Sequence, residues 1–488
     1  MAALCLLPLQ AVTTAATANA AVKQTQVALT FDDGNADQMT VLPILAAHHM
    51  VGTFYIITGS VGAPNYLTQA NIATIAAAGN EIGGHTVSHP DLTSVPAAEA
   101  TRQICNGRAT LASWGYQVTD FAYPYADLNA SVEAIVKSCG FNSGRGLGDI
   151  ASAHGCTGCA VAESVPPKDA YDLQAVDELD NTWTLAQMEA VVTAAEAKGG
   201  MVPFTIHHLC DGTGCDPLSI TPTLFDQFLT WLGTQSSKGV SVKTVHQILG
   251  GTVKPIVTAP ASTNTVLPNP SLETSTTGDG FPDCYMPAGY GNNTATWAET
   301  TDAHTGKVAE QLTVTGYTDG DAKLLPTFDL GSCTPAITAG NVYTASVWYK
   351  STGISQFALY TRTVGGYWSY WTSGPWLAPA ATWTQAVFTL PAAPAGAVGV
   401  SFGIAMIANG TLETDDYAIA AGTSPAVPAT TKVNVIAGSK LAAIAPAVTS
   451  AAANKTASGK ASAWGKHARP LVPASSPGHV IAPPALDD

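Results

Sequence analysis

Two adjacent carboxylates, Asp32 and Asp33, follow a short apolar run and stand directly before Gly34. The run over residues 27–31 is continuous and typical of a buried strand, and Asp-Asp-Gly marks the turn that ends it. Neighbouring carboxylates at the end of a core strand repel each other unless a cation lies between them. A solvated turn is the plain alternative, so a second set of ligands is needed to favour a metal site.

Two histidines, His85 and His89, form that second set, and they follow the pair Gly83-Gly84. Residues four apart in a helical turn lie on the same side and can share one ion. Pro90 disfavours helical dihedrals at His89, which predicts a single turn rather than a long helix. A histidine pair alone is weak evidence, but together with the paired carboxylates it indicates a metal site. One aspartate and two histidines leave coordination positions open, as catalytic rather than structural sites do.

Residues 30–34 (Thr-Phe-Asp-Asp-Gly) and 85–90 (His-Thr-Val-Ser-His-Pro) resemble the first two motifs of the polysaccharide deacetylases with NodB homology, carbohydrate esterase family 4. The resemblance covers roughly residues 25–250 and implies a distorted (β/α) barrel that removes acetyl groups from sugars. It also implies that Asp32 is the catalytic base and that Asp33, His85 and His89 bind a divalent metal. Spacing alone leaves open which aspartate has which role. Zinc is the expected ion, and the ligand types also permit cobalt or nickel.

Residues 121–125 (Phe-Ala-Tyr-Pro-Tyr) are similar to the third motif of this family. The resemblance implies that the backbone N–H of Tyr125 donates to the oxyanion that develops during acyl transfer. At Ala122 the family often has an arginine that contacts the base. Arg145, just after the next predicted strand, is a candidate to supply the missing cation, and a surface arginine is the alternative interpretation.

Residues 204–208 (Phe-Thr-Ile-His-His) resemble the last motif of the family, whose histidine protonates the leaving group. The position after the strand favours His207 as this acid, and a neutral-range pKa suits histidine to the role. Neighbouring strand residues point in opposite directions, so only one of His207 and His208 should face the site. Asp180 is a candidate for the aspartate that tunes this histidine.

Short apolar runs alternate with helical patterns from residue 27 to about residue 250. This alternation predicts an α/β fold with a parallel sheet wrapped by helices, in open or barrel form. Asp32, His85, Tyr125 and His207 each follow a predicted strand, so one rim of the sheet can hold them. We expect strands at 52–57, 81–84, 120–123 and 201–206, and helices at 36–50, 68–78, 97–114, 131–138 and 185–198.

The remaining chain divides into a linker, an all-β domain and a tail. The predicted boundaries are an export signal over residues 1–20, the deacetylase domain over 21–252, a linker over 253–265, a β-sandwich over 266–422 and a disordered Ala/Pro-rich tail over 423–488. Closely spaced strands without helical patterns indicate the sandwich. Its strands are expected at 307–315, 342–349, 357–363, 383–390, 398–408 and 415–419.

Aromatic residues gather in the second domain between residues 360 and 383. Flat aromatic faces pack against the apolar faces of sugar rings, so Trp368, Tyr370 and Trp371 are candidate sugar-binding residues. The alternative is that all of them belong to the core. As a whole the domain resembles a jelly-roll carbohydrate-binding module of the family 4/9 type, which implies a polysaccharide as partner.

Composition limits the partners and the compartment. Only 11% of the 488 residues are charged and the formal net charge is -15, which argues against nucleic acids and anionic membranes as partners. No stretch is long enough to span a membrane, and we expect a monomer. Eight cysteines follow the export signal, and an even number in an exported protein favours disulfides. The expected pairs are 156 with 159, 210 with 215, 105 with 139 and 284 with 333. A four-cysteine zinc ribbon is the alternative for the first two of these pairs.

The sequence therefore predicts a secreted, metal-dependent hydrolase that removes acetyl groups from a polysaccharide. N-acetyl groups of chitin-like or peptidoglycan glycans are the expected target. An O-acetyl esterase acting on xylan and a catalytically inactive carbohydrate-binding protein are the alternatives.

Overall fold

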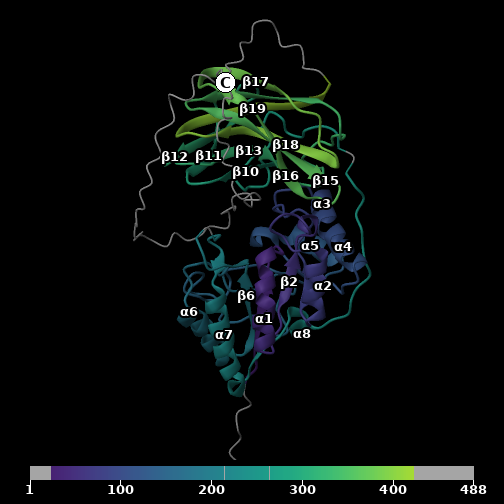
Figure 1. Ribbon diagram of the computed structural model, residues 1–488, viewed down its shortest axis with the longest axis vertical. Coiled ribbons are helices and arrows are strands. Elements are labelled where there is room, and N and C mark those ends of the chain that lie inside the picture. Colours follow the sequence, from purple (N-terminus) through teal and green to yellow (C-terminus); the bar gives the residue numbers. More distant parts are fainter. Residues whose placement is uncertain (1–22, 214, 263, 423–488) are drawn as a thin grey trace, which may run out of the picture.

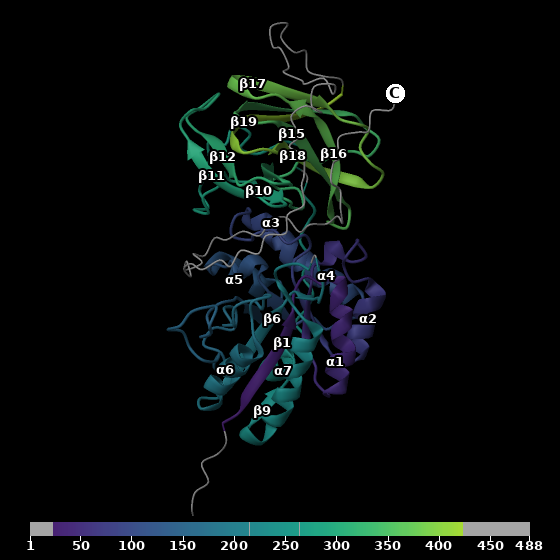
Figure 2. The same cartoon turned by 60° about the vertical axis from the view of Figure 1, so that its left-hand side comes forward.

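The protein, seen here in a computed structural model, is described over residues 23–213, 215–262 and 264–422 and consists of two domains (Figure 1). An α/β domain precedes an all-β domain, and in both views the second lies against the end of the first where α3 is found (Figures 1 and 2). The export signal expected over residues 1–20 and the disordered tail expected over 423–488 lie outside the described residues.

The first domain is built on a curled, seven-stranded parallel sheet. Its strand order is β5-β4-β3-β2-β1-β6, and β9 pairs with β1. Apolar residues of β1 are fully buried because helices and the neighbouring strands cover both faces, which explains the continuous apolar run. The strands are β1 (Thr25–Phe31), β2 (Thr53–Ile56), β3 (Glu81–Gly84), β4 (Asp120–Ala122), β5 (Ser143–Arg145), β6 (Gly200–Ile206) and β9 (Val240–Val242), and a separate pair is formed by β7 (His208–Leu209) and β8 (Ser219–Ile220).

The sheet is a distorted barrel of the expected kind, because an irregular segment bridges its two edges. The N–H of Leu173 donates to the carbonyl oxygen of Gly144 in β5 at 2.8 Å, and the N–H of Leu179 donates to the carbonyl oxygen of Thr205 in β6 at 2.9 Å. The backbone between these two contacts therefore takes the place of a missing strand. All the carboxyl ends of the strands consequently face one rim.

Helices cover the outside of this sheet. They are α1 (Val41–Ala47), α2 (Gln69–Ala77), α3 (Ala97–Thr101), α4 (Gly107–Ser113), α5 (Ala130–Ser138), α6 (Leu185–Glu196), α7 (Pro222–Thr234) and α8 (Val245–Leu249). Two expected helices are interrupted. The first is a 3-10 turn over Ala36–Thr40 followed by α1, and a π-helical turn over Arg102–Asn106 joins α3 to α4. The turn over Arg102–Asn106 is buried and carries side chains toward the second domain.

The second domain is a sandwich of two antiparallel sheets. Their strand orders are β10-β13-β18-β15-β16 and β11-β12-β19-β14-β17. Buried apolar side chains from the facing sheets, among them Val347, Phe402 and Leu412, form one core. The strands are β10 (Tyr285–Tyr290), β11 (Thr294–Thr300), β12 (Ala309–Thr315), β13 (Asp321–Pro326), β14 (Tyr343–Ser351), β15 (Ser355–Thr363), β16 (Trp368–Leu377), β17 (Ala380–Thr389), β18 (Ala397–Met406) and β19 (Gly410–Ala421).

The segment between the domains is fastened to the first domain. Arg108, which is buried, donates to the carbonyl oxygens of Lys254 and Pro255 at 2.9 Å each. Asn106 makes two further hydrogen bonds with the backbone of Ala259, at 2.8 and 3.1 Å. The predicted linker thus runs along the first domain for much of its length, and this constrains where the sandwich can lie.

The four expected disulfides are confirmed. They join Cys105 to Cys139, Cys156 to Cys159, Cys210 to Cys215 and Cys284 to Cys333. Cysteines 156, 159, 210 and 215 therefore form two local bridges, and the zinc-ribbon alternative is wrong. Within the described ranges, no helix combines the length and apolar character needed to cross a bilayer.

Candidate metal and catalytic site

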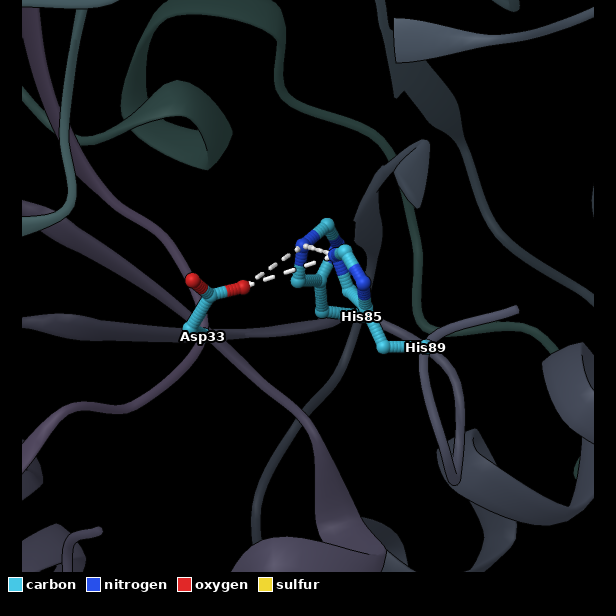
Figure 3. A group of neighbouring side chains, drawn as sticks. All are labelled: Asp33, His85 and His89. Carbon is cyan, nitrogen blue, oxygen red and sulfur yellow. Dashed lines mark hydrogen bonds and ion pairs between the residues drawn. The ribbon is translucent and has the colours of Figure 1, made fainter. Parts of the chain in front are cut away.

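Asp33, His85 and His89 converge at the carboxyl ends of β1 and β3 (Figure 3). The Nε2 atoms of the two histidines lie 3.0 Å apart, and they are 3.4 and 3.5 Å from Oδ1 of Asp33. Asp33 and His89 both have positive φ, at 73° and 60°. Such dihedrals are uncommon outside glycine, and they turn the side chains toward one point.

One hydrogen bond determines the orientation of His85. Its Nδ1 lies 2.8 Å from the carbonyl oxygen of Ala122, and a carbonyl can only accept. Nδ1 must therefore carry the hydrogen, so the neutral ring presents the lone pair of Nε2 toward Asp33. A backbone carbonyl that fixes the tautomer in this way is common behind metal-binding histidines.

The three side chains fit a divalent ion. Tetrahedral zinc has bonds of roughly 2.0–2.1 Å to nitrogen and oxygen, so two of its ligand atoms are about 3.3 Å apart. The separations of 3.0 to 3.5 Å found here agree with that edge length. Moreover, Oδ1 of Asp33 is buried without a hydrogen-bond partner, which is the condition of an atom whose partner is a cation.

Electrostatics favour a charged Asp33 carboxylate beside a neutral His89. Burial alone would raise the pKa of Asp33, but the neighbouring His85 and the charges of His89 and His207 together hold that pKa below its usual value. Burial alone would lower the pKa of His85, but the adjacent Asp33 and Asp32 raise it overall. Burial and the neighbouring His85 lower the pKa of His89 to about 3. An ionised aspartate and a neutral histidine are the forms that bind metals.

Asp32 forms a buried ion pair with Arg145. Nη2 of Arg145 donates to Oδ2 of Asp32, and both residues are 3% exposed or less. Nη1 of Arg145 also donates to the hydroxyl of Thr205 at 3.0 Å, which fixes the guanidinium. Oδ1 of Asp32 is buried without a hydrogen-bond partner. Arg145 of β5 thus contacts Asp32, while its role in orienting a catalytic base stays a prediction.

Tyr125 lies beside the histidines. It has φ of 58°, and its ring meets that of His89 edge to face with centroids 4.5 Å apart. The positive φ belongs to a short 3-10 turn, Pro124–Ala126, directly after β4. The turn brings the backbone of the third motif to the same rim as the metal ligands.

The two histidines after β6 have different surroundings. His208 points to Asp37, with 2.9 Å between its Nδ1 and the carboxylate. His207 interacts electrostatically with Asp33 and Glu178, and its Nδ1 is buried without a hydrogen-bond partner among the described residues. The choice of His207 over His208 as the acid stays a prediction.

Asp180 is engaged in its own turn. Its Oδ1 accepts from the N–H and the hydroxyl of Thr182, at 2.8 and 2.6 Å. Glu178 is the carboxylate on which His207 acts: burial raises the pKa of Glu178 and His207 opposes that rise. The acid-tuning role of Asp180 stays a prediction. Glu178 is a second carboxylate that interacts with His207, and the resemblance to the family motifs did not indicate it.

Gln38 is a second residue that the motifs did not indicate. Its Nε2 donates to the carbonyl oxygens of Asp32, at 2.5 Å, and His207, at 3.0 Å. This fully buried amide therefore joins the ends of β1 and β6, which carry the candidate base and the candidate acid. Its position in a polar stretch, three residues after Asn35, gave no signal of that role.

The aromatic residues predicted to bind sugar differ in exposure. Trp368 is 8% exposed, its ring stacks on Phe328 and its indole N–H donates to Asp329. Trp371 packs partly buried against the sandwich core. Tyr370 is 38% exposed. Trp368 is therefore not open to a sugar ring, because Phe328 covers its face and Asp329 binds its indole N–H.

Residues 19–144 match the family described as polysaccharide deacetylase. A peptidoglycan N-acetylglucosamine deacetylase of Listeria monocytogenes is 32% identical over 110 residues, which are 22% of this chain and 23% of that protein. A chitooligosaccharide deacetylase of Sinorhizobium fredii is 28% identical over 202 residues, 41% of this chain and 78% of that protein. The match thus spans about a quarter of the Listeria protein.

Among solved structures, a peptidoglycan N-acetylglucosamine deacetylase aligns with a TM-score of 0.34 and 18% identity, over 48% of this chain and 92% of that one. A family 4 carbohydrate esterase from Streptomyces lividans, in complex with acetate, has a TM-score of 0.30 and 18% identity, over 45% and 92% of the two chains. The N-terminal part of this chain is therefore similar to polysaccharide deacetylases.

Proposed function

We propose that this chain is a secreted, metal-dependent deacetylase that hydrolyses N-acetyl groups of a chitin-like or peptidoglycan glycan. The observation that carries the proposal is the convergence of two arrangements at one rim. Asp33, His85 and His89 present three ligand atoms to one point, and the adjacent Asp32 is held by Arg145. The sandwich, as a carbohydrate-binding module, would hold the enzyme on its polymer.

Asp33, His85 and His89 would hold the divalent ion, zinc being preferred and cobalt or nickel compatible with the ligands. When bound, such an ion lowers the pKa of a coordinated water and polarises a carbonyl. The chain itself supplies the remaining groups. Oδ1 of Asp32 has no other partner, so it can accept a proton from the attacking water while Arg145 holds Oδ2.

The backbone N–H of Tyr125 would donate to the oxyanion that forms when water attacks the acetyl carbonyl, a contact of the kind worth about 3 kcal/mol. His207 would then protonate the sugar nitrogen as the carbon–nitrogen bond breaks. The products are acetate and a free amine. His207 is preferred for this role because Nδ1 of His208 is paired with Asp37.

The test is acetate release by the purified full chain from chitopentaose, peptidoglycan fragments and acetylated xylan, each with and without chelator. We expect release from an N-acetylated glycan, loss of it with chelator and recovery with zinc. Release from acetylated xylan alone would identify an O-acetyl esterase instead. No release from any substrate by the zinc-loaded protein would favour a binding protein without turnover.

A further inference from the structure

The sandwich contacts the loop that carries the histidine ligands. The hydroxyl of Ser88, which lies between His85 and His89, donates to the carbonyl oxygen of Phe328 at 3.1 Å. Gln103 accepts from the N–H of Ser88 at 2.9 Å, so the same loop is also fastened to the first domain. The second domain thus meets the first beside the metal ligands.

A hairpin of the sandwich packs closely on the first domain. Residues 364–367 connect β15 to β16, and Gly366, with φ of 95°, lies against Val87. A Cβ added at Gly366 would be 2.4 Å from Cγ1 of Val87, and one added at Gly59 would be 2.9 Å from the carbonyl carbon of Gly366. Only glycines allow this approach of one backbone to the other.

A cavity lies between the two domains and reaches the candidate site. His89, Tyr125 and Tyr66 line it from the first domain, and Phe328, Tyr360 and Tyr367 line it from the sandwich. The cavity is therefore continuous with the metal ligands and is rich in aromatic rings from both domains.

The aromatic wall of the sandwich is supported from behind. Phe328 stacks on Trp368, with ring centroids 4.8 Å apart and planes 10° from parallel. The indole N–H of Trp368 donates to Asp329 at 3.1 Å, so Trp368 itself is fixed and buried. Tyr367, which is only partly buried, is the residue of this strand end that can offer a ring to a ligand in the cavity.

We propose that the sandwich completes the substrate cleft, with Tyr367 as the platform for a pyranose ring adjacent to the sugar whose acetyl group is removed. The proposal rests on the proposed function and adds a sugar subsite shared by the two domains. Flat aromatic faces pack against the apolar faces of pyranose rings while the hydroxyls remain hydrated. Tyr66 and Tyr125 form the opposite wall, so a glycan chain in the cavity would touch both domains at once.

The test compares Tyr367→Ala with Val364→Ala, a control on the same hairpin whose side chain is exposed and outside the cavity lining. The substrate is the oligosaccharide of the panel above that the wild-type protein deacetylates. For Tyr367→Ala we expect KM to rise about tenfold or more, with kcat changed less than threefold. Tyr367→Phe keeps the ring and should restore KM to near the wild-type value, while Val364→Ala should leave it unchanged. Circular dichroism checks that all variants fold.

An unchanged KM in folded Tyr367→Ala, or a loss that Tyr367→Phe does not restore, would overturn the subsite. If the wild-type protein deacetylates none of the panel, the proposed function fails and the subsite is judged by calorimetric binding of chitopentaose. Weaker binding by Tyr367→Ala than by Val364→Ala would then support the subsite. Equal binding by both variants, or no binding by the wild-type protein, would overturn it.

Discussion

At the scale of single residues, the ion pair between Asp32 and Arg145 is the contact on which the proposed base depends. Both side chains are buried, and one oxygen of Asp32 is held by the arginine while the other has no partner. A buried carboxylate that loses its cation is left uncompensated, which is costly to the fold as well as to the chemistry. Arg145 is therefore expected to affect turnover and stability together.

Arg145→Ala should lower kcat for acetate release by about 10²- to 10³-fold, since general acid–base groups contribute in this range. It should also reduce the free energy of unfolding by roughly 3–5 kcal/mol, because breaking a buried pair leaves an unpaired charge. Arg145→Lys keeps the positive charge but loses the second contact, to Thr205. Its kcat and its free energy of unfolding should lie between those of the wild-type protein and Arg145→Ala. Acetate release and urea unfolding measure these effects. Wild-type turnover in Arg145→Ala would contradict the role.

A second residue, Glu310 of β12, predicts a pH dependence of stability. It is 2% exposed, and burial together with the charges of Glu299 and Asp279 raises its pKa to about 8. The folded state therefore holds a proton that the unfolded chain, with an ordinary pKa of 4.5, releases. Stability from this group is complete below about pH 4.5 and is lost as the pH rises through 8.

Glu310→Gln should consequently be more stable than the wild-type protein at pH 9, by on the order of a few kcal/mol. The difference should shrink toward zero at pH 4.5, and urea unfolding at both pH values measures it. Glu299→Gln, on the exposed neighbouring strand β11, is the control and should have a much smaller effect. An equal difference at both pH values would show that Glu310 does not titrate as described.

At the scale of elements, the ends of β1, β3 and β6 position the chemistry, and two glycines of β3 allow them to approach. A Cβ added at Gly84 would be 2.7 Å from Cζ of Phe141, and one added at Gly83 would be 2.4 Å from Cδ1 of Tyr55. These distances are shorter than any ordinary contact, so β3 and His85 can take their places only because these positions lack side chains.

Gly84→Ala should destabilise the protein by about 1–3 kcal/mol, as overpacking of a core does. The control is Gly233→Ala in α7, where an added Cβ would meet no heavy atom within 4 Å. That change should stabilise by up to about 1 kcal/mol because alanine favours helices. Thermal unfolding measures both. If Gly84→Ala were as stable as the wild-type protein, β3 and Phe141 could move apart without a loss of stability, which would contradict this account of Gly84.

The elements that sequence predicts well are those whose signal is local. β3 agrees with its predicted range residue for residue, and β6 begins one residue early. α7 was missed, although Thr221 caps it, Pro222 occupies its first turn and buried apolar residues recur at helical spacing. That signal was available in the sequence. The bulge in the pairing of β15 with β16 was not, because it depends on the partner strand.

The candidate site shows the same division. Motif positions and strand ends indicated Asp32, Asp33, His85, His89, Tyr125 and His207, and Arg145 followed from the absent arginine at Ala122. Gln38 and Glu178 were not indicated. They reach the site through the 3-10 turn after β1 and through a backbone bridge beside β6, and neither contact leaves a pattern in the sequence. Their roles can be recognised only once the strands are placed in space.

At the scale of the whole molecule, the two domains share a buried polar contact. Glu99 of α3 is fully buried, and its Oε1 accepts from the N–H of Leu330 at 2.6 Å, while its Oε2 accepts from Arg102. Arg102 also donates to Ser332 of the sandwich. With the linker fastened along the first domain, the two domains should unfold together.

Differential scanning calorimetry should therefore show one cooperative transition for the wild-type chain. Glu99→Ala should separate it into two, because Arg102 and the N–H of Leu330 both lose their buried partner. Glu189→Ala on α6, far from the sandwich in both views, is the control and should keep a single transition (Figures 1 and 2). Two separate transitions in the wild-type protein would contradict this coupling.

The central claim is that Asp33, His85 and His89 bind one divalent ion on which hydrolysis depends. Its most direct test is a zinc titration of the chelator-treated full chain, with bound zinc and acetate release measured in the same samples. We predict that activity rises in proportion to bound zinc and reaches its maximum at about one equivalent, and that folded His89→Ala gains neither. Full acetate release by the metal-free protein, or tight zinc binding that His89→Ala leaves intact, would contradict the claim.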